Sequence, residues 1–253
     1  MGTVFSIHVV DDGDWTAAID QVVADLHWVD ETFSTYRPLS QISRLGRRET
    51  KLRDCDPAVG EVLGLCADVQ AGSNGYFTAT IGGALDPSGV VKGWAIQRAS
   101  DTLTAAGATA HAVNGGGDMQ VVGGRFAGQP WRVGIAHPLQ PGALATVVTG
   151  RDLAVATSGR SERGCHIIDP WTGRPPVGLA SITVTGPAIT LVDGYATSAY
   201  AMGAAARDWI EGMDGYEAFA VTDDGGCWST TGFVGESGAP ADHLHPGRRR
   251  GCR

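Results

Sequence analysis

The sequence AHAVNGGGDMQVV, residues 110–122, indicates the fold class of this chain, because two short β-like segments flank a glycine turn. Residues 110–113 and 120–122 carry the apolar and β-branched side chains that strands favour. Asn114 and the three glycines after it supply the backbone freedom that a tight turn needs. The stretch therefore predicts strands separated by tight turns in the middle of the chain.

Outward from this stretch, strand and helix patterns follow one another in mixed order. The expected strands cover residues 4–10, 110–113, 120–122, 131–136, 145–148, 153–156, 181–185, 218–221 and 228–230. The expected helices cover residues 15–32, 57–71, 91–106 and 193–202, with one more around Trp209 and Ile210. Asp14 and Asp56 are the expected caps of the first two helices. This order is neither regular βαβ nor all-β, so it predicts an α+β domain, with helices packed on an antiparallel sheet.

Composition limits the kinds of partner. The formal net charge of −8 argues against a nucleic acid or an anionic membrane as the main partner. No apolar run is long enough to span a bilayer, so we expect no stable membrane insertion. The five cysteines are scattered, without CxxC spacing or a zinc pattern. The start MGTVFSIHVV lacks the features of a signal peptide, which predicts a cytoplasmic protein; a trimmed leader would instead mean export or membrane anchoring.

The segment Asp193-Gly194-Tyr195-Ala196-Thr197 has the spacing of a two-ligand metal site. Residues four apart lie on one face of a helix, so the Asp193 carboxylate and the Thr197 hydroxyl can meet at one point. Hard oxygen ligands of this kind suit Mg²⁺, which completes its shell with water and phosphate oxygens. The alternative is that Asp193 simply caps the helix.

Residues 85–93, LDPSGVVKG, form a glycine-bearing turn that leads into a helix. Such a turn exposes backbone N–H groups to phosphate, and Lys92 could add a positive charge. The spacing of a Walker A loop is absent. The alternative is an ordinary connection with a solvated lysine.

Three further segments carry candidate chemistry. Residues 114–118, NGGGD, either let a ligand approach the backbone closely or form only a turn. His166, beside the Asp169-Pro170 turn, is either a general base or a structural histidine. Tyr36 either stacks on an aromatic ring or is a partly buried tyrosine.

The order of these motifs along residues 1–231 resembles the ApbE family of FAD:protein FMN transferases. The segments that carry the resemblance are MGT at 1–3, STYRP at 34–38, SQIS at 40–43, the turn at 86–93, GGGD at 115–118, ATSG at 156–159, HIIDPWTGRP at 166–175 and VDGYAT at 192–197. The last two are the most specific.

The resemblance implies a single T-fold-related domain with FAD in a cleft, here residues 1–237, followed by a disordered tail at 238–253. By position it implies Asp193 and Thr197 as Mg²⁺ ligands, the Gly89 carbonyl as a backbone ligand, and Ala196 where some relatives have another ligand. The implied FAD contacts are Met1, Tyr36, Tyr76, Phe77, Thr78, Asp86, Lys92 and Ile168. Many members have Phe-Asp or Met-Asp where this chain has Phe77-Thr78, and a longer segment before Asp86.

The resemblance also implies an Mg²⁺-dependent transfer of FMN from FAD to a Thr or Ser hydroxyl of an acceptor protein, with release of AMP. The acceptor's proton requires a base, for which His166 and Asp118 are the candidates. The alternatives are an FAD pyrophosphatase, in which water replaces the acceptor, and a non-catalytic FAD-binding protein.

Overall fold

The computed structural model describes residues 2–160 and 167–237. The helices are α1 (Thr16–Phe33), α2 (Gln41–Gly46), α3 (Pro57–Gly72), α4 (Ser88–Ala105), α6 (Ile189–Met202) and α7 (Ala206–Glu211). Short 3₁₀ turns are η1 (Leu52–Asp54), η2 (Phe126–Gly128) and η3 (Gly203–Ala205). The strands are β1 (Phe5–Val9), β2 (Thr80–Ile81), β3 (Ala84–Leu85), β4 (His111–Gly115), β5 (Asp118–Val122), β6 (Trp131–Ala136), β7 (Leu144–Gly150), β8 (Leu153–Gly159), β9 (Leu179–Gly186), β10 (Glu217–Thr222), β11 (Cys227–Ser229) and β12 (Gly235–Ser237).

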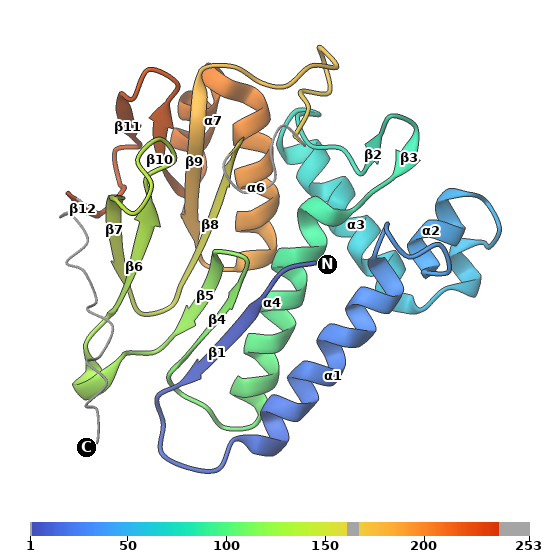
Figure 1. Cartoon of the computed structure of the whole chain (residues 1–253), viewed down its shortest axis with the longest axis horizontal. Coiled ribbons are helices and arrows are strands. Elements are labelled where there is room, and N and C mark those ends of the chain that lie inside the picture. Colours follow the sequence, from blue (N-terminus) through green and yellow to red (C-terminus); the bar gives the residue numbers. More distant parts are fainter. Residues whose placement is uncertain (1, 161–166, 238–253) are drawn as a thin grey trace, which may run out of the picture.

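A seven-stranded sheet in the order β1-β4-β5-β8-β9-β10-β11 forms the centre of the molecule (Figure 1). Every neighbouring pair in it is antiparallel. The stretch 110–122 becomes the hairpin β4–β5, with Gly115 opposite Asp118 across the turn. The predicted α+β class with an antiparallel sheet is confirmed.

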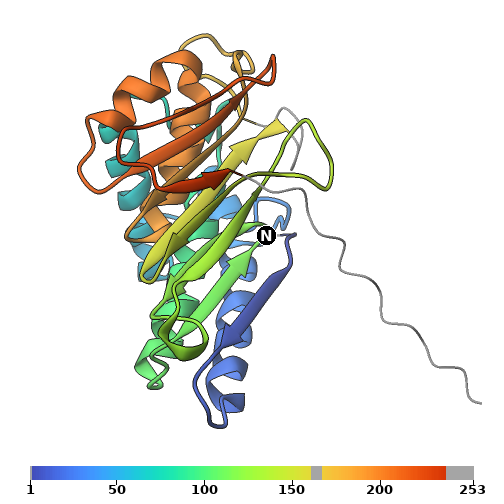
Figure 2. The same cartoon turned by 90° about the vertical axis from the view of Figure 1, so that its left-hand side faces the viewer.

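The helices cover one face of this sheet, as Figure 2 shows from the side. Alternate residues of the strands, such as Val113 of β4 and Ile182 of β9, point into a core shared with α4 and α6. A second core lies among α1, α3 and α4 and holds Phe33, Val62 and Trp94. Both α1 and α4 contribute buried residues to the two cores, so these helices connect them.

The opposite face of the sheet carries the smaller sheet β12-β7-β6. Val121 and Val155 point to this side and pack against Trp131 and Val133 of β6. The period of two in a strand thus places neighbouring residues in different cores.

Helix caps follow the sequence signals in part. The Asp56 carboxylate accepts the Ala58 N–H (2.9 Å) at the start of α3, as predicted. The Asp14 carboxylate accepts the Thr16 N–H (2.9 Å), although the N-cap position of α1 is Trp15. Both carboxylates therefore satisfy N–H groups that a helix start leaves unpaired.

The prediction that a helix begins near Asp193 is wrong, because α6 begins at Ile189. Its N-cap residue, Ala188, has no side-chain acceptor, and three of the first four residues are β-branched (Ile189, Thr190 and Val192), so the sequence lacks a start signal. Helix α4 likewise begins at Ser88 rather than at Val91. The sequence patterns missed α2, the β2–β3 hairpin and β12, which are all six residues or shorter.

Within residues 2–160 and 167–237, no helix combines the length and the apolar character that crossing a membrane requires. The predicted tail at 238–253 lies outside the described residues.

Candidate active site

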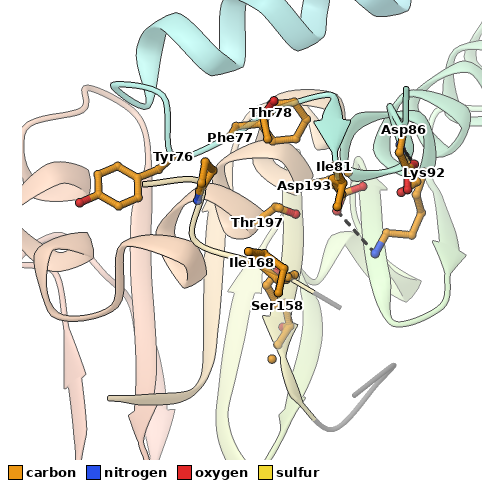
Figure 3. A pocket seen from close by; sticks show the side chains of 16 residues that line it. Tyr76, Phe77, Thr78, Ile81, Asp86, Lys92, Ser158, Ile168, Asp193 and Thr197 are labelled. Atoms are coloured by element: carbon orange, nitrogen blue, oxygen red, sulfur yellow. Dashed lines mark hydrogen bonds and ion pairs between the residues drawn. The ribbon is translucent and has the colours of Figure 1, made fainter. Parts of the chain in front are cut away.

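A pocket of about 870 Å³, its open mouth included, lies between the N-terminal half of α4, the start of α6 and the end of β8. The residues that line it are Tyr76, Phe77, Thr78, Ile81, Asp86, Ser88, Gly89, Lys92, Thr157, Ser158, Gly159, Ile167, Ile168, Pro170, Asp193 and Thr197. Nine of them are residues that the sequence singled out. In Figure 3, Tyr76 lies at one end of the pocket and Asp86 and Lys92 lie at the other.

The closest approach of α4 to α6 occurs at Gly93 and holds Asp193 in place. The Gly93 N–H donates to Asp193 Oδ2 (2.8 Å). A Cβ added at Gly93 would lie 2.5 Å from the Ile189 carbonyl oxygen and 2.7 Å from Asp193 Cβ, so only glycine fits without movement. Asp193 lies more than one turn inside α6 with 3% of its surface exposed. The alternative that Asp193 is the helix N-cap is therefore wrong.

Lys92 is the cation of a buried charge cluster. Its Nζ forms an ion pair with Asp118 Oδ2. The same Nζ lies 3.5 Å from Asp193 Oδ1, the contact that the dashed line in Figure 3 marks. Asp118 has no exposed surface, and its Oδ1 accepts the Thr157 N–H (2.9 Å). Two buried carboxylates thus share one ammonium group. Only 19% of the Lys92 side chain is exposed and its ammonium group is paired, so the alternative of an ordinary connection with a solvated lysine is wrong.

Burial raises the pKa of Asp193, since a low-dielectric site disfavours its charged form. The Lys92 ammonium opposes this effect, whereas the neighbouring Asp118 carboxylate raises the pKa of Asp193 further. The carboxyl group therefore has an excess of negative charge around it, and a second cation would relieve that excess.

The oxygen donors at this site fit a hard cation that takes only a few of its ligands from the protein. Asp193 and Thr197, four apart on α6, and Gly89 of α4 all line the pocket. A Cβ added at Gly89 would lie 2.8 Å from Phe77 Cε2 and 3.6 Å from Thr197 Cγ2, so the backbone here runs close to both neighbours. No three His, Cys, Asp or Glu side chains of the described residues form a metal cluster. A metal held here would therefore depend on oxygen atoms of a ligand and water.

Ala196 does not join the other predicted ligands. It is fully buried in the core between the sheet and the helices and does not line the pocket. Helical geometry explains this, because residue 196 faces about 100° away from residue 197 on the same helix.

Asp86 connects the pocket to the start of α4. Its Oδ1 accepts the Ser88 N–H (3.0 Å), and its own N–H donates to the Ala79 carbonyl (2.8 Å). These bonds fold the segment between the β2–β3 hairpin and α4 over the pocket. Asp86 consequently orders this turn and also faces the cavity.

The other end of the pocket is apolar and aromatic, with Phe77 buried and Tyr76 and Ile168 partly exposed. Tyr76 also contacts Trp171, with ring centroids 6.5 Å apart and an edge-on arrangement. A flat aromatic ligand at this end would meet side chains that suit it. A charged group would suit the opposite end, where Lys92 lies.

Residues 169–174 form a tight turn built by Asp169. Its carboxylate accepts the Trp171 N–H and the Thr172 hydroxyl (both 2.9 Å), and its backbone pairs with Arg174. The turn places Pro170 in the pocket wall and Trp171 at its exposed rim. His166 lies outside the described residues, so its role as a base remains a prediction.

Tyr36 is not among the lining residues, and 91% of its surface is exposed. The alternative of a partly buried tyrosine is therefore wrong, while stacking on a ligand stays a prediction. Met1, the other FAD contact predicted near the chain start, lies outside the described residues.

Several lining residues were not predicted as site residues. They are Ile81, Ser88, Thr157, Ser158, Gly159, Ile167 and Pro170. Thr157 to Gly159 belong to the ATSG segment of the family resemblance, which is a usable signal. Ile81 lies in the missed hairpin and has no sequence signal of its own.

Comparisons with known proteins agree on one family. The model of the "ApbE family" matches residues 1–86 and 82–220. The chain is 36% identical over 157 residues to an FAD:protein FMN transferase of Rhodobacter capsulatus, a match that covers 58% of this chain and 29% of the relative. A protein of the same name from Haemophilus influenzae is 26% identical over 80% of this chain and 79% of its own length.

Solved structures show the same fold. The flavin transferase ApbE from Vibrio cholerae superposes with a TM-score of 0.78 at 22% identity, covering 92% of this chain and 96% of that one. The apo form of the Pseudomonas stutzeri flavinyl transferase ApbE gives 0.77 at 23% identity, covering 91% and 93%. The matched stretch spans 29% and 39% of the first two curated relatives.

Proposed function

Because this chain belongs to the ApbE family, we propose that it is an Mg²⁺-dependent FAD:protein FMN transferase. It moves FMN from FAD to a Thr or Ser hydroxyl of an acceptor protein and releases AMP. The observation that carries the proposal is the two-ended pocket, in which Lys92 and Asp193 lie at the polar end and Tyr76 and Phe77 at the aromatic end.

In this proposal FAD binds with its flavin ring toward Tyr76 and Ile168 and its pyrophosphate toward Lys92. The acceptor oxygen forms a bond to the phosphorus on the FMN side, and the bond from this phosphorus to the oxygen of AMP breaks. The reaction needs positioning and charge neutralisation more than covalent help from the protein. Helices α4 and α6 supply both, since they hold Lys92 and Asp193 against one another.

Asp193, Thr197 and the Gly89 carbonyl are the proposed protein ligands of Mg²⁺. When bound, the ion would neutralise charge on the phosphate oxygens and so lower the barrier to attack on phosphorus and to departure of AMP. Ala196 could offer only a backbone atom, and it is left out of this ligand set because the whole residue is buried in the core and does not line the pocket.

Asp118 suits a role in orienting Lys92 better than the role of base. It has no exposed surface, and its two oxygens already contact Thr157 and Lys92. A base must come within hydrogen-bond reach of the proton that it removes. His166 is therefore the proposed base, and it accepts the proton of the acceptor hydroxyl.

Release of AMP separates an enzyme from a flavin-binding protein. The purified protein is incubated with FAD and Mg²⁺, with and without a candidate acceptor, and AMP is measured by chromatography. Covalent FMN on the acceptor, detected by mass spectrometry, identifies the transferase. AMP release with free FMN alone identifies an FAD pyrophosphatase, and no AMP under either condition contradicts catalysis.

Three variants test the metal ligands. Asp193→Asn removes a charge at nearly constant volume and should lower the rate by at least about a hundred-fold, because even outer-shell partners of metal sites contribute about 10–100-fold. Thr197→Val should act in the same direction, less strongly. Ser198→Ala is the matched control, since the Ser198 hydroxyl bonds to the Gly194 carbonyl of its own helix (2.7 Å). Equal rates in all three variants would contradict the ligand assignment.

A further inference from the structure

One corner of this acidic chain carries a local excess of positive charge. Residues 44–53, RLGRRETKLR, contain five cations and one anion, a net charge of +4, so the other 243 residues carry a net −12. The cations are Arg44, Arg47, Arg48, Lys51 and Arg53, and all five are exposed. We call these five residues the basic corner.

Part of this charge has no partner in the fold. Arg47 forms an ion pair with Glu49 (2.7 Å), and Arg53 lies 3.8 Å from Asp54. Arg44, Arg48 and Lys51 make no ion pair with any described residue. The Arg47 hydrogen bond lowers the pKa of the Glu49 carboxyl group, and the nearby charge of Arg44 lowers it further. Arg48 and Lys51 have no carboxylate partner among the described residues, so their charges can attract an anionic surface.

Exposed aliphatic side chains stand beside these cations. Leu39 is 84% exposed, and Leu52, within the basic segment, is 45% exposed. The loop that holds Leu39 is fixed to the corner, because an Arg47 Nη2 donates to the Pro38 carbonyl (2.6 Å). The surface therefore presents cations and single apolar side chains together.

This combination favours a lipid bilayer over a protein partner. Protein interfaces concentrate their apolar groups in a central core and surround it with a polar rim. Here Leu39 and Leu52 project singly from two separate segments, among cations. Peripheral membrane surfaces combine apolar side chains that enter the headgroup layer with Lys and Arg that attract anionic lipids.

From the charge, the exposure and this spacing of apolar groups, we propose that the basic corner is a docking surface for an anionic membrane. It binds peripherally and does not cross the bilayer. The overall charge of −8 had argued against such a partner. The net charge of a chain is an average, however, whereas attraction over a Debye length of about 10 Å depends on the local charge.

The corner adjoins the pocket. Helix α2 lies beside the β2–β3 hairpin in Figure 1, and a Cβ added at Gly46 would lie 3.2 Å from Leu85 Cβ. Leu85 directly precedes Asp86 of the pocket wall. Docking would consequently bring this wall of the pocket close to the headgroups. The inference does not depend on the proposed reaction, and its test uses no flavin.

The test is cosedimentation of the full chain with vesicles of phosphatidylcholine, with or without phosphatidylglycerol. We expect binding only to the phosphatidylglycerol vesicles, and its loss at high salt. Replacing Arg48 and Lys51 by Ala should weaken binding about 25-fold, because each cation near an anionic surface contributes a factor of about five. The charge reversals Arg48→Glu and Lys51→Glu should weaken it further.

Two controls separate the corner from charge in general. The double variant Arg125→Glu with Arg207→Glu lowers the net charge by the same amount as Arg48→Glu with Lys51→Glu. Both residues are exposed, Arg125 directly before η2 and Arg207 in α7. This variant should leave binding intact. Replacement of the three arginines at 248–250 by Ser tests the basic C-terminal residues and should also leave binding intact. Leu39→Ser with Leu52→Ser should weaken binding several-fold without changing its salt dependence.

Thermal melting of each variant checks that it folds. The proposal is overturned by equal binding to neutral vesicles, by no binding at low salt, or by a paired reversal that binds like its control. Loss of binding on replacement of residues 248–250 alone would assign the activity to the C-terminus instead.

Discussion

Replacement of Gly93 by Ala tests the contact that holds the two halves of the site together. The new methyl group would lie 2.5 Å from the Ile189 carbonyl oxygen and 2.7 Å from Asp193 Cβ. Both neighbours belong to a helix, so the backbones of α4 and α6 must separate. Overpacking of this kind typically costs about 1–3 kcal/mol.

Helix propensity acts in the opposite direction, since Ala is favoured over Gly in a helix by about 1 kcal/mol. Gly64 of α3 provides the matched control, because a Cβ added there meets nothing within 4 Å. Gly64→Ala should therefore be stabilised by the higher helix propensity of Ala and should not be destabilised by a clash. The difference between the two variants therefore isolates the close approach of α4 to α6.

The assay is thermal or urea unfolding of both variants. A 1 kcal/mol change shifts the Tm of a domain of this size by about 2–4 °C. Gly93→Ala should thus melt lower than Gly64→Ala by about 2–12 °C, and it should lose FAD-dependent AMP release. Equal melting temperatures would refute the reasoning, because they would mean that the helices have room for a methyl group.

Four further outcomes follow from the site and from the cysteines. Asp118→Asn should fold normally yet lower AMP release about a hundred-fold, the typical cost of misplacing a reacting group by about 1 Å; wild-type AMP release would contradict a role of Asp118 in orienting Lys92. In fluorescence titrations, Tyr76→Ala should weaken FAD binding by about 1 kcal/mol or more, the usual value of an aromatic pair, and an unchanged Kd would remove it from the flavin site. The same titration of Tyr36→Ala decides whether this exposed side chain stacks on FAD. Alkylation of the native protein near pH 8 should modify the exposed Cys227 and spare Cys66, because burial raises the pKa of the Cys66 thiol to about 12; peptide mapping that finds Cys66 modified would contradict its burial.

Local patterns predicted the elements whose signals are local. The Asp56-Pro57 start of α3 and the hairpin of residues 110–122 were both predicted from a few residues. The Asp193–Thr197 pair lines one pocket, as a spacing of four on a helix requires. The structure corrected the start of this helix, because its first turn has no side-chain cap and its residues would equally suit a strand, and it placed Ala196 in the core.

The charge cluster could not be predicted in this way. Lys92, Asp118 and Asp193 come from α4, β5 and α6, and their contacts depend on how the helices cross the sheet. Sequence alone could therefore treat Lys92 as solvated and Asp118 as a possible base. Burial and pairing are properties of the packed domain. They show that Lys92 is paired rather than solvated, and they weaken the interpretation of Asp118 as a base.

The close crossing at Gly93 also divides the pocket into a rigid wall and an adaptable one. Gly89, Lys92, Asp193 and Thr197 lie on two helices that are anchored in the main core. The facing wall consists of the segments around residues 76–86 and 167–170, which are turns and a hairpin of two-residue strands. The polar half is therefore preorganised, so ligand entry need not reorganise it. Substitutions intended to change which ligand binds should therefore be made in the facing segments, which lie outside α4 and α6.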